Sequence, residues 1–157
     1  MAANDFRASN PVLIAPSAWR KWAINDRLYV QQGAYTTGDS QMHDIAAANG
    51  KIVCSGAQVS RIAAVNHEFS FTPLWWPKFV SALAPQDRRH LTGLAMERGV
   101  PRYLTVTACA DRPQAWKDGT RGGGAFDAQK GNVIRAGLGF PSSPRPIDGR
   151  FGCASKA

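Results

Sequence analysis

The chain has 157 residues, of which 44% are hydrophobic and 19% are charged, a composition typical of a folded protein rather than of a disordered chain. Its 19 Lys and Arg outnumber its 11 Asp and Glu, for a formal net charge of +8, which favours polyanionic neighbours such as nucleic acid or acidic protein surfaces. No apolar run approaches the roughly 18 residues of a membrane-spanning helix, and the N-terminus lacks a signal-peptide pattern. We therefore expect a cytoplasmic or particle-associated protein.

Composition divides the chain into three parts. Residues 1–16 are expected to be an N-terminal arm, residues 17–110 a single α+β domain, and residues 111–157 a loop-rich basic tail. Nine of the 15 glycines lie in residues 119–152, so within the tail we expect one short strand, at residues 132–140. No internal repeat is evident in the sequence.

The first half of the chain predicts several strands and two helices, the first a short one that Ser17 can cap. Ser40 or Asp39 can cap a helix that runs to Ala48, and Asn49-Gly50 would end it. The segment 59–71 alternates mainly apolar with other residues, which predicts a long or bent strand. β-rich composition predicts further strands at residues 11–16, 27–32, 51–55 and 102–109.

The segment at about 73–98 predicts a helix pair. In its first half, apolar side chains recur at the i, i+3, i+4 and i+7 spacing of a helix face, namely Trp76, Phe79, Val80 and Leu83. In its second half, Leu91, Leu94 and Ala95 form a stripe, which Gly99 and Pro101 would end. The predicted fold class is therefore α+β: a compact mixed sheet with this helix pair and an extended Gly/Pro-rich C-terminal tail.

The tract GTRGGGAFDAQKGN, residues 119–132, suggests a phosphate-binding loop at first sight. It lacks the Gly-Lys-Ser/Thr ending of a Walker A loop and the third glycine of a dinucleotide fingerprint. A single Arg121-Gly122-Gly123 is also too little for a repeated RNA-binding tract. We expect a flexible surface loop, with nucleic-acid contact as the alternative.

Five arginines are candidates for nucleic-acid contact. Two helices joined by a short turn would resemble a helix-turn-helix, whose second helix reads bases with its N-terminal residues. A solvated helix face is the alternative interpretation. The candidates are Arg88, Arg89, Arg98, Arg102 and Arg121.

An aromatic cluster, FTPLWWPKF, offers candidates for protein contact. Trp76 and Phe79 fit the predicted core stripe, whereas Trp75 falls off it. Aromatic residues are enriched at interface cores. We therefore expect Trp75, together with Leu74, to contact a protein partner.

Catalytic and metal-binding signals are weak. His43, His67 and Glu68 are candidates for general acid/base work if they lie close together. Neighbours on a strand point to opposite faces, however, so His67 and Glu68 would not share one site. The three widely spaced cysteines lack zinc-finger spacing and predict free thiols in a reducing compartment, with one disulfide as the alternative. We assign no catalytic, cofactor-binding or metal residue, and no small-molecule ligand.

The leading hypothesis is a non-enzymatic structural subunit of a larger particle such as a virion. Segments with the composition of the two ends cannot bury enough apolar surface alone to offset their ordering entropy. We therefore expect them to pack on other protein subunits, copies of the chain or different proteins. The alternatives are a nucleic-acid-binding module that uses the Arg88/Arg89 helix and the basic tail, and a small hydrolase or nuclease that uses His67, Glu68 and His43.

Overall fold

The computed structural model describes the backbone of residues 12–16 and 29–34. It describes backbone and side chains of residues 35, 37–66, 68–69, 71–77, 80–81, 85–119 and 121–156. Eleven strands and one short 3-10 helix follow one another in this part of the chain: β1 (Val12–Pro16), β2 (Tyr29–Ala34), β3 (Met42–Ala48), β4 (Lys51–Gly56), β5 (Arg61–Ala64), β6 (Thr72–Trp75), β7 (Leu91–Glu97), β8 (Val100–Val106), η1 (Ala115–Asp118), β9 (Gly123–Asp127), β10 (Val133–Ile147) and β11 (Arg150–Lys156).

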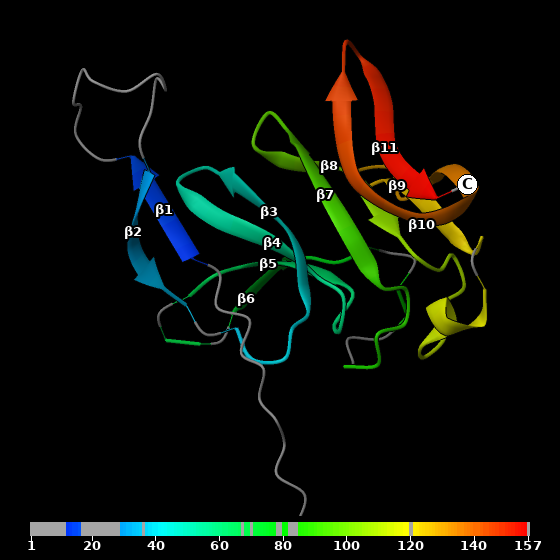
Figure 1. Ribbon diagram of the computed structural model, residues 1–157, viewed down its shortest axis with the longest axis horizontal. Coiled ribbons are helices and arrows are strands. Elements are labelled where there is room, and N and C mark those ends of the chain that lie inside the picture. Colours follow the sequence, from blue (N-terminus) through cyan, green and yellow to red (C-terminus); the bar gives the residue numbers. More distant parts are fainter. Residues whose placement is uncertain are drawn as a thin grey trace, which may run out of the picture.

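All pairings between these strands are antiparallel (Figure 1). One sheet has the order β3-β4-β5-β6, a second has the order β11-β10-β9-β8-β7, and β1 pairs with β2. Within each sheet, sequential strands are therefore spatial neighbours. No helix within the described ranges is long and apolar enough to span a membrane.

The predicted α+β class with a helix pair at about 73–98 is wrong. The described residues of this segment contain strand β6 and strand β7 instead; Phe79 and Leu83 lie outside the described residues. In β7, register shifts at Leu91/Gly93 and Ala95/Met96 interrupt the strict alternation of a strand. Buried Leu91, Leu94 and Ala95 consequently fall at the spacing of a helix face, which explains the wrong prediction.

The helix predicted to end at Ala48 is also a strand, β3. Asn49 and Gly50 both have positive φ, 50° and 73°, and Ala48 lies opposite Lys51. These residues form a two-residue hairpin turn of the type for which Asn-Gly is the strongest sequence signal. Asn49-Gly50, which was expected to end a helix, is therefore the turn of a β-hairpin. By contrast, the strands predicted at 11–16, 51–55 and 102–109 are confirmed in position to within a few residues.

The expected extended C-terminal tail belongs to the second sheet. Gly123–Asp127, inside the supposed flexible loop, forms β9, and all five of its residues are buried. A Cβ added to Gly123 would lie 2.6 Å from Pro141 Cδ, and one added to Gly124 would lie 2.6 Å from Cys109 Sγ. The glycines thus permit close packing between β9 and its neighbours, a requirement that depends on tertiary contacts.

Residues in the left-handed conformation reveal a structural repeat. Twelve residues with positive φ fall into four sets of three. Within each set, the second residue follows the first by 49 positions and the third follows the second by 50. The three members of a set occupy the same place before or after equivalent strands. These sets are Gly38, Asp87 and Gly137; Gln41, His90 and Phe140; Asn49, Arg98 and Asp148; and Gly50, Gly99 and Gly149. The chain therefore repeats a unit of about 50 residues, although no internal repeat was expected from the sequence.

Each complete repeat unit is a four-stranded antiparallel meander. β3 to β6 form the first unit; β7, β8, β9 and the first part of β10 form the second. β10 then bends, and its second part pairs with β11 through the Asp148-Gly149 turn, repeating the hairpin that opens each unit. The second unit has a longer connection between its second and third strands, which carries η1.

Neighbouring units pack through their first strands, because β7 lies against β3 on one side and β10 on the other. Between the first two units, the Leu94 N–H donates a hydrogen bond of 3.0 Å to Asp44 Oδ2. At the next junction, Pro144 takes the place of Leu94, and Gly93 takes the place of Asp44. A Cβ on Gly93 would meet Pro144 Cδ at 2.3 Å, so a polar contact at one junction becomes close packing at the next.

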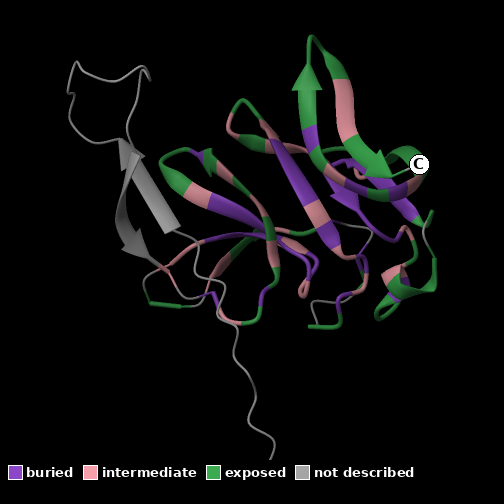
Figure 2. Ribbon diagram, viewed as in Figure 1, coloured by how far each residue is buried: buried purple, intermediate pink, exposed green. Residues whose placement is uncertain are grey.

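The core lies between the units, and Figure 2 shows buried residues on β4, on β9 and on β7, the edge strand that faces the first unit. The contiguous cluster joins residues from β4, β5, β7, β8 and β9, with Ala48 at the end of β3. Its buried members are Ala48, Val53, Ile62, Leu91, Leu94, Leu104, Val106, Phe126 and Ala128.

Candidate functional site

Polar and aromatic side chains gather where the first strands of the two complete units begin. They come from β3, the segment before β7 and the long connection between β8 and β9. One group, the histidine cluster, consists of His43, Asp87, His90 and Trp116. A second group, the arginine network, surrounds the carboxylate of Asp111.

Asp87 fixes the orientation of His90. Both carboxylate oxygens of Asp87 lie 2.9 Å from His90 Nδ1, and the Asp87 side chain is only 7% exposed. Asp87 and His90 each take a left-handed backbone conformation, with φ of 44° and 51°. Because the carboxylate accepts from Nδ1, this nitrogen carries a proton.

The rings of His43 and Trp116 contact the His90 ring from two sides. His43 meets it edge-on with ring centroids 4.8 Å apart, and Trp116 stacks on it at 4.5 Å. Trp116 Nε1 is buried and has no hydrogen-bond partner among the described residues. The cluster thereby ties the first strand of one unit to the long connection of the next.

The surroundings of His43 lower its pKa, although part of the residue is exposed. Burial of its ring lowers the pKa of His43 from 6.5, and the nearby His90 lowers it further, while Asp87 opposes the change. An uncharged imidazole can accept a proton or a hydrogen bond.

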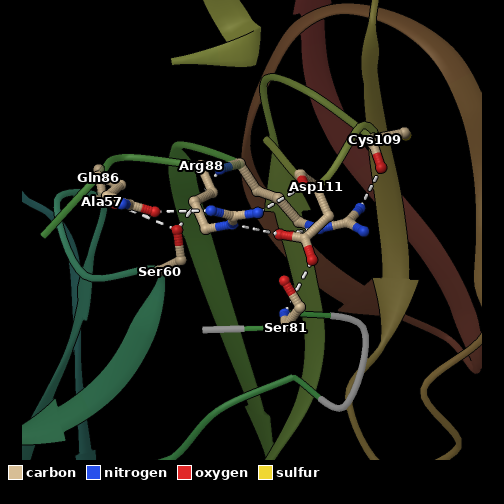
Figure 3. Close-up of polar contacts among 8 residues, drawn as sticks. Ala57, Ser60, Ser81, Gln86, Arg88, Cys109 and Asp111 are labelled. Atoms are coloured by element: carbon tan, nitrogen blue, oxygen red, sulfur yellow. Dashed lines mark hydrogen bonds and ion pairs between the residues drawn. The ribbon is translucent and has the colours of Figure 1, made fainter. Parts of the chain in front are cut away.

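The arginine network holds the loop before β7 against the segment after β8 (Figure 3). Arg88 Nε lies 2.9 Å from Asp111 Oδ1, and Arg88 Nη2 donates to the Asp111 carbonyl at 2.8 Å. The Ser81 N–H donates to the other Asp111 carboxylate oxygen at 2.8 Å. Burial alone would raise the pKa of Asp111, but the hydrogen bonds from Ser81 and Arg88 hold it below its ordinary value.

Arg89 is a buried member of this network. Its side chain is 9% exposed and its Nε lies 3.9 Å from Asp111 Oδ1, while its Nη1 donates to the Cys109 carbonyl. Burial lowers the pKa of Arg89. The guanidinium also lies 5.9 Å from the centre of the Phe126 ring, so it packs between the sheet and the loops.

The five arginines proposed for nucleic-acid contact therefore divide into two groups. Arg88 and Arg89 are engaged as described, and Arg102 lies 2.9 Å from Asp127 Oδ2 and also contacts Glu97. Arg98 and Arg121 are exposed, one in a hairpin turn and the other before β9. The structure brings Arg88 and Arg89 together, but no helix presents them.

The two protein-contact candidates differ in exposure. Leu74 is 44% exposed, whereas Trp75 is half-buried and packs against the core cluster. Trp76, expected in the core, is 47% exposed. The expected burial of the two tryptophans is thus reversed, because β6 is a strand and adjacent residues face opposite sides.

The residues considered for acid/base work are not assembled into a described site. His43 lies in β3, Glu68 is exposed in the connection between β5 and β6, and His67 lies outside the described residues. In the described part of the chain, no group of three or more His, Cys, Asp and Glu side chains is placed to hold a metal ion. Cys54, Cys109 and Cys153 are free thiols.

Sequence reasoning missed Asp87, His90 and Trp116 of the histidine cluster and Asp111 of the arginine network. Asp87 and His90 occupy left-handed repeat positions, so recognition of the repeat would have marked them. Trp116 belongs to the insertion that only the second unit carries, and no sequence signal pointed to it.

The family described as Domain of unknown function (DUF4915) matches residues 11–154. The chain belongs to this family. The DUF4915 match begins just before β1 and ends within β11, so it spans every strand described above. The chain matches no curated protein and no solved structure.

Proposed function

We propose that this DUF4915 chain is a non-enzymatic assembly subunit of a larger particle, which binds other protein subunits by strand addition. The observation that carries the proposal is β11, a strand of seven residues at the end of its sheet. Among the described strands it pairs with β10 alone. Such an edge presents backbone donors and acceptors to a strand from another subunit.

Exposed apolar side chains lie close to this edge. Ile147, opposite Arg150 of β11, is 59% exposed, and Phe140 of β10 is 37% exposed. Such residues gain free energy when a partner covers them. Leu74 on β6, in the other sheet, is a third exposed apolar residue that a partner could cover, whereas Trp75 beside it packs against the core cluster.

The histidine cluster and arginine network support a structural rather than a catalytic role. The Asp87 carboxylate accepts a hydrogen bond from His90, and the Asp111 carboxylate accepts hydrogen bonds from Arg88 and Ser81. The contacts of Asp111 join segments 23 and 30 residues apart in sequence, whereas the Asp87–His90 contact lies within one loop. These groups therefore stabilise loops and junctions between units.

Nucleic-acid binding is the alternative function. The ion pairs within the chain argue against nucleic-acid contact by the arginines that the sequence suggested. Arg88, Arg89 and Arg102 are all close to carboxylates within the chain. Phosphate contact would need these pairs to break. Binding of a DNA or RNA probe that weakens steeply with salt would favour this alternative.

Sizing in extracts of cells that express the full chain naturally tests the proposed assembly function. Under mild lysis and physiological salt, we expect the chain to sediment in a complex well above monomer mass, and nuclease treatment should leave this complex intact. Sedimentation as a monomer would contradict the proposal. Collapse of the complex on nuclease treatment would favour the nucleic-acid alternative.

A further inference from the structure

The repeat assigns a place to every strand of the chain. After the two complete units, the second part of β10 and β11 correspond to the first and second strands of another unit. At the other end, β1 begins at Val12, which is 49 residues before the Arg61 that begins β5. β1 and β2 therefore correspond to the third and fourth strands of a unit.

In the first unit, the third strand covers the second. β5 pairs with β4, and Cys54 lies opposite Ala63. Val53 and Cys54 are 2% and 1% exposed. The equivalent residues Gly152 and Cys153 of β11 are half-buried, as are Arg102 and Tyr103 of β8, which β9 covers. The uncovered side of β11 thus corresponds to the surface that β5 occupies on β4.

The composition of β1 suits this covering position. In β5, Ile62, Ala63 and Ala64 are all buried, and the corresponding segment of β1 reads Val-Leu-Ile-Ala. Among the described strands β1 pairs with β2 alone. Figure 1 shows β1 and β2 at the opposite end of the molecule from the β10–β11 hairpin, so β1 and β11 of one chain do not meet.

We propose that β1 of one copy pairs antiparallel with β11 of a second copy, so that β1–β2 and β10–β11 together form one four-stranded unit. This inference rests on the proposed assembly function and names its partner as a second copy of the chain. If both chains pair reciprocally, the four complete units (two from each chain) and the two shared units close a ring of six. Four-stranded sheets arranged around an axis form closed rings of about four to eight units, a range that includes six.

The β4–β5 pairing predicts the register of this contact. Cys54 lies opposite Ala63, and Val53 lies opposite Ala64. In the repeat, Cys153 is equivalent to Cys54 and Ile14 to Ala63, so we expect Cys153 to lie opposite Ile14. By the same correspondence, we expect Gly152 to lie opposite Ala15. A slip of one residue would move every side chain of the strand to the other face of the sheet. A measurement of the register therefore tests the proposed pairing.

A disulfide across the proposed contact tests the register directly. The full chain with Ile14→Cys should form a covalent dimer with the native Cys153 under mild oxidation, visible on a non-reducing gel. The matched control carries Ile14→Cys together with Cys153→Ser. Cys54 will not compete, because it is buried and its burial raises the pKa of the thiol to about 11. Equal amounts of covalent dimer in variant and control would overturn the proposal.

A second pair of variants tests the contact without a cross-link. Cys153→Lys places a charge where the partner strand would bury it, whereas Val133→Lys changes a 48% exposed residue at the start of β10. We expect light scattering to give a dimer for the wild type and for Val133→Lys, and a monomer for Cys153→Lys with unchanged circular dichroism. A dimer that survives Cys153→Lys would overturn the proposal.

A wild-type monomer would also overturn this inference while leaving the assembly function open. In that case a large complex in native extracts would indicate that a different protein covers β11. A monomer in both measurements would contradict both proposals.

Discussion

The backbone N–H of Leu94 donates a hydrogen bond of 3.0 Å to the carboxylate of Asp44 and so joins the first strands of two successive units. Asp44 also accepts from the N–H of Ile45 at 2.9 Å, and its side chain is 16% exposed. One short acidic side chain therefore fixes both the local strand and its neighbour in the next unit.

Replacing Asp44 by alanine should weaken the junction between the first two units. The Leu94 N–H would lose its acceptor, and a buried polar group without a partner costs about 1–3 kcal/mol. Chemical denaturation of the full chain measures this loss in the free energy of unfolding. Asp39→Ala, at an exposed position, is the control and should change stability by less. Equal losses in the two variants would contradict the role of Asp44.

Gly93→Ala should be destabilising at the next junction. The added Cβ would lie 2.3 Å from Pro144 Cδ and 2.6 Å from Thr105 Oγ1, and overpacking of this kind costs about 1–3 kcal/mol. Gly119→Ala is the control, because nothing lies within 4 Å of its Cβ position. Thermal unfolding of the two variants should separate them clearly. A Gly93→Ala protein as stable as the control would show that the two strands do not pack this closely.

Removal of the Arg88 side chain should loosen the loop before β7. Arg88 and Asp111 are 15% and 19% exposed, and the loss of a charged hydrogen bond at such a site costs about 1–3 kcal/mol. Arg112 pairs with Asp118 where both side chains are more than half exposed, so Arg112→Ala should cost only about 0–1 kcal/mol. Denaturant midpoints compare the two variants. The reverse order of stability would contradict the network.

His43 should make the protein less stable as the pH falls. Its pKa is lowered in the folded chain from the ordinary 6.5, so on acidification the unfolded chain binds a proton first. The free energy of unfolding should therefore be highest above pH 6.5 and decrease as the pH falls toward the folded pKa. His43→Gln should reduce this decrease between pH 7.5 and about 5. An unchanged pH profile in this variant would contradict the lowered pKa of His43.

The sequence predicted individual strands better than it predicted the fold. Residues 51–55 and 102–109 are rich in β-forming side chains, and their local preference agrees with the structure. In β7 and β3, local patterns and tertiary structure disagree. A bulged strand with Gly93 at its centre has the apolar spacing of a helix, and Asn49-Gly50 serves equally as a helix end and a hairpin turn.

The candidate site depended on contacts that no local pattern encodes. His43 and His90 belong to successive units, and their rings meet only because β3 packs against β7. Arg88 was expected to contact nucleic acid from an exposed surface, because no local pattern shows its partner Asp111, which lies 23 residues farther along the chain. The recurrence of glycine at 50, 99 and 149 was the available signal that a comparison of segments about 50 residues apart would have detected.

The molar mass of the purified full chain tests the central claim of self-assembly most directly. Sedimentation equilibrium over a wide range of protein concentrations should show a monomer that converts to a species of twice its mass and no larger, because two reciprocal strand contacts close the ring. A monomer at every concentration, or open-ended growth beyond the dimer, would contradict the account.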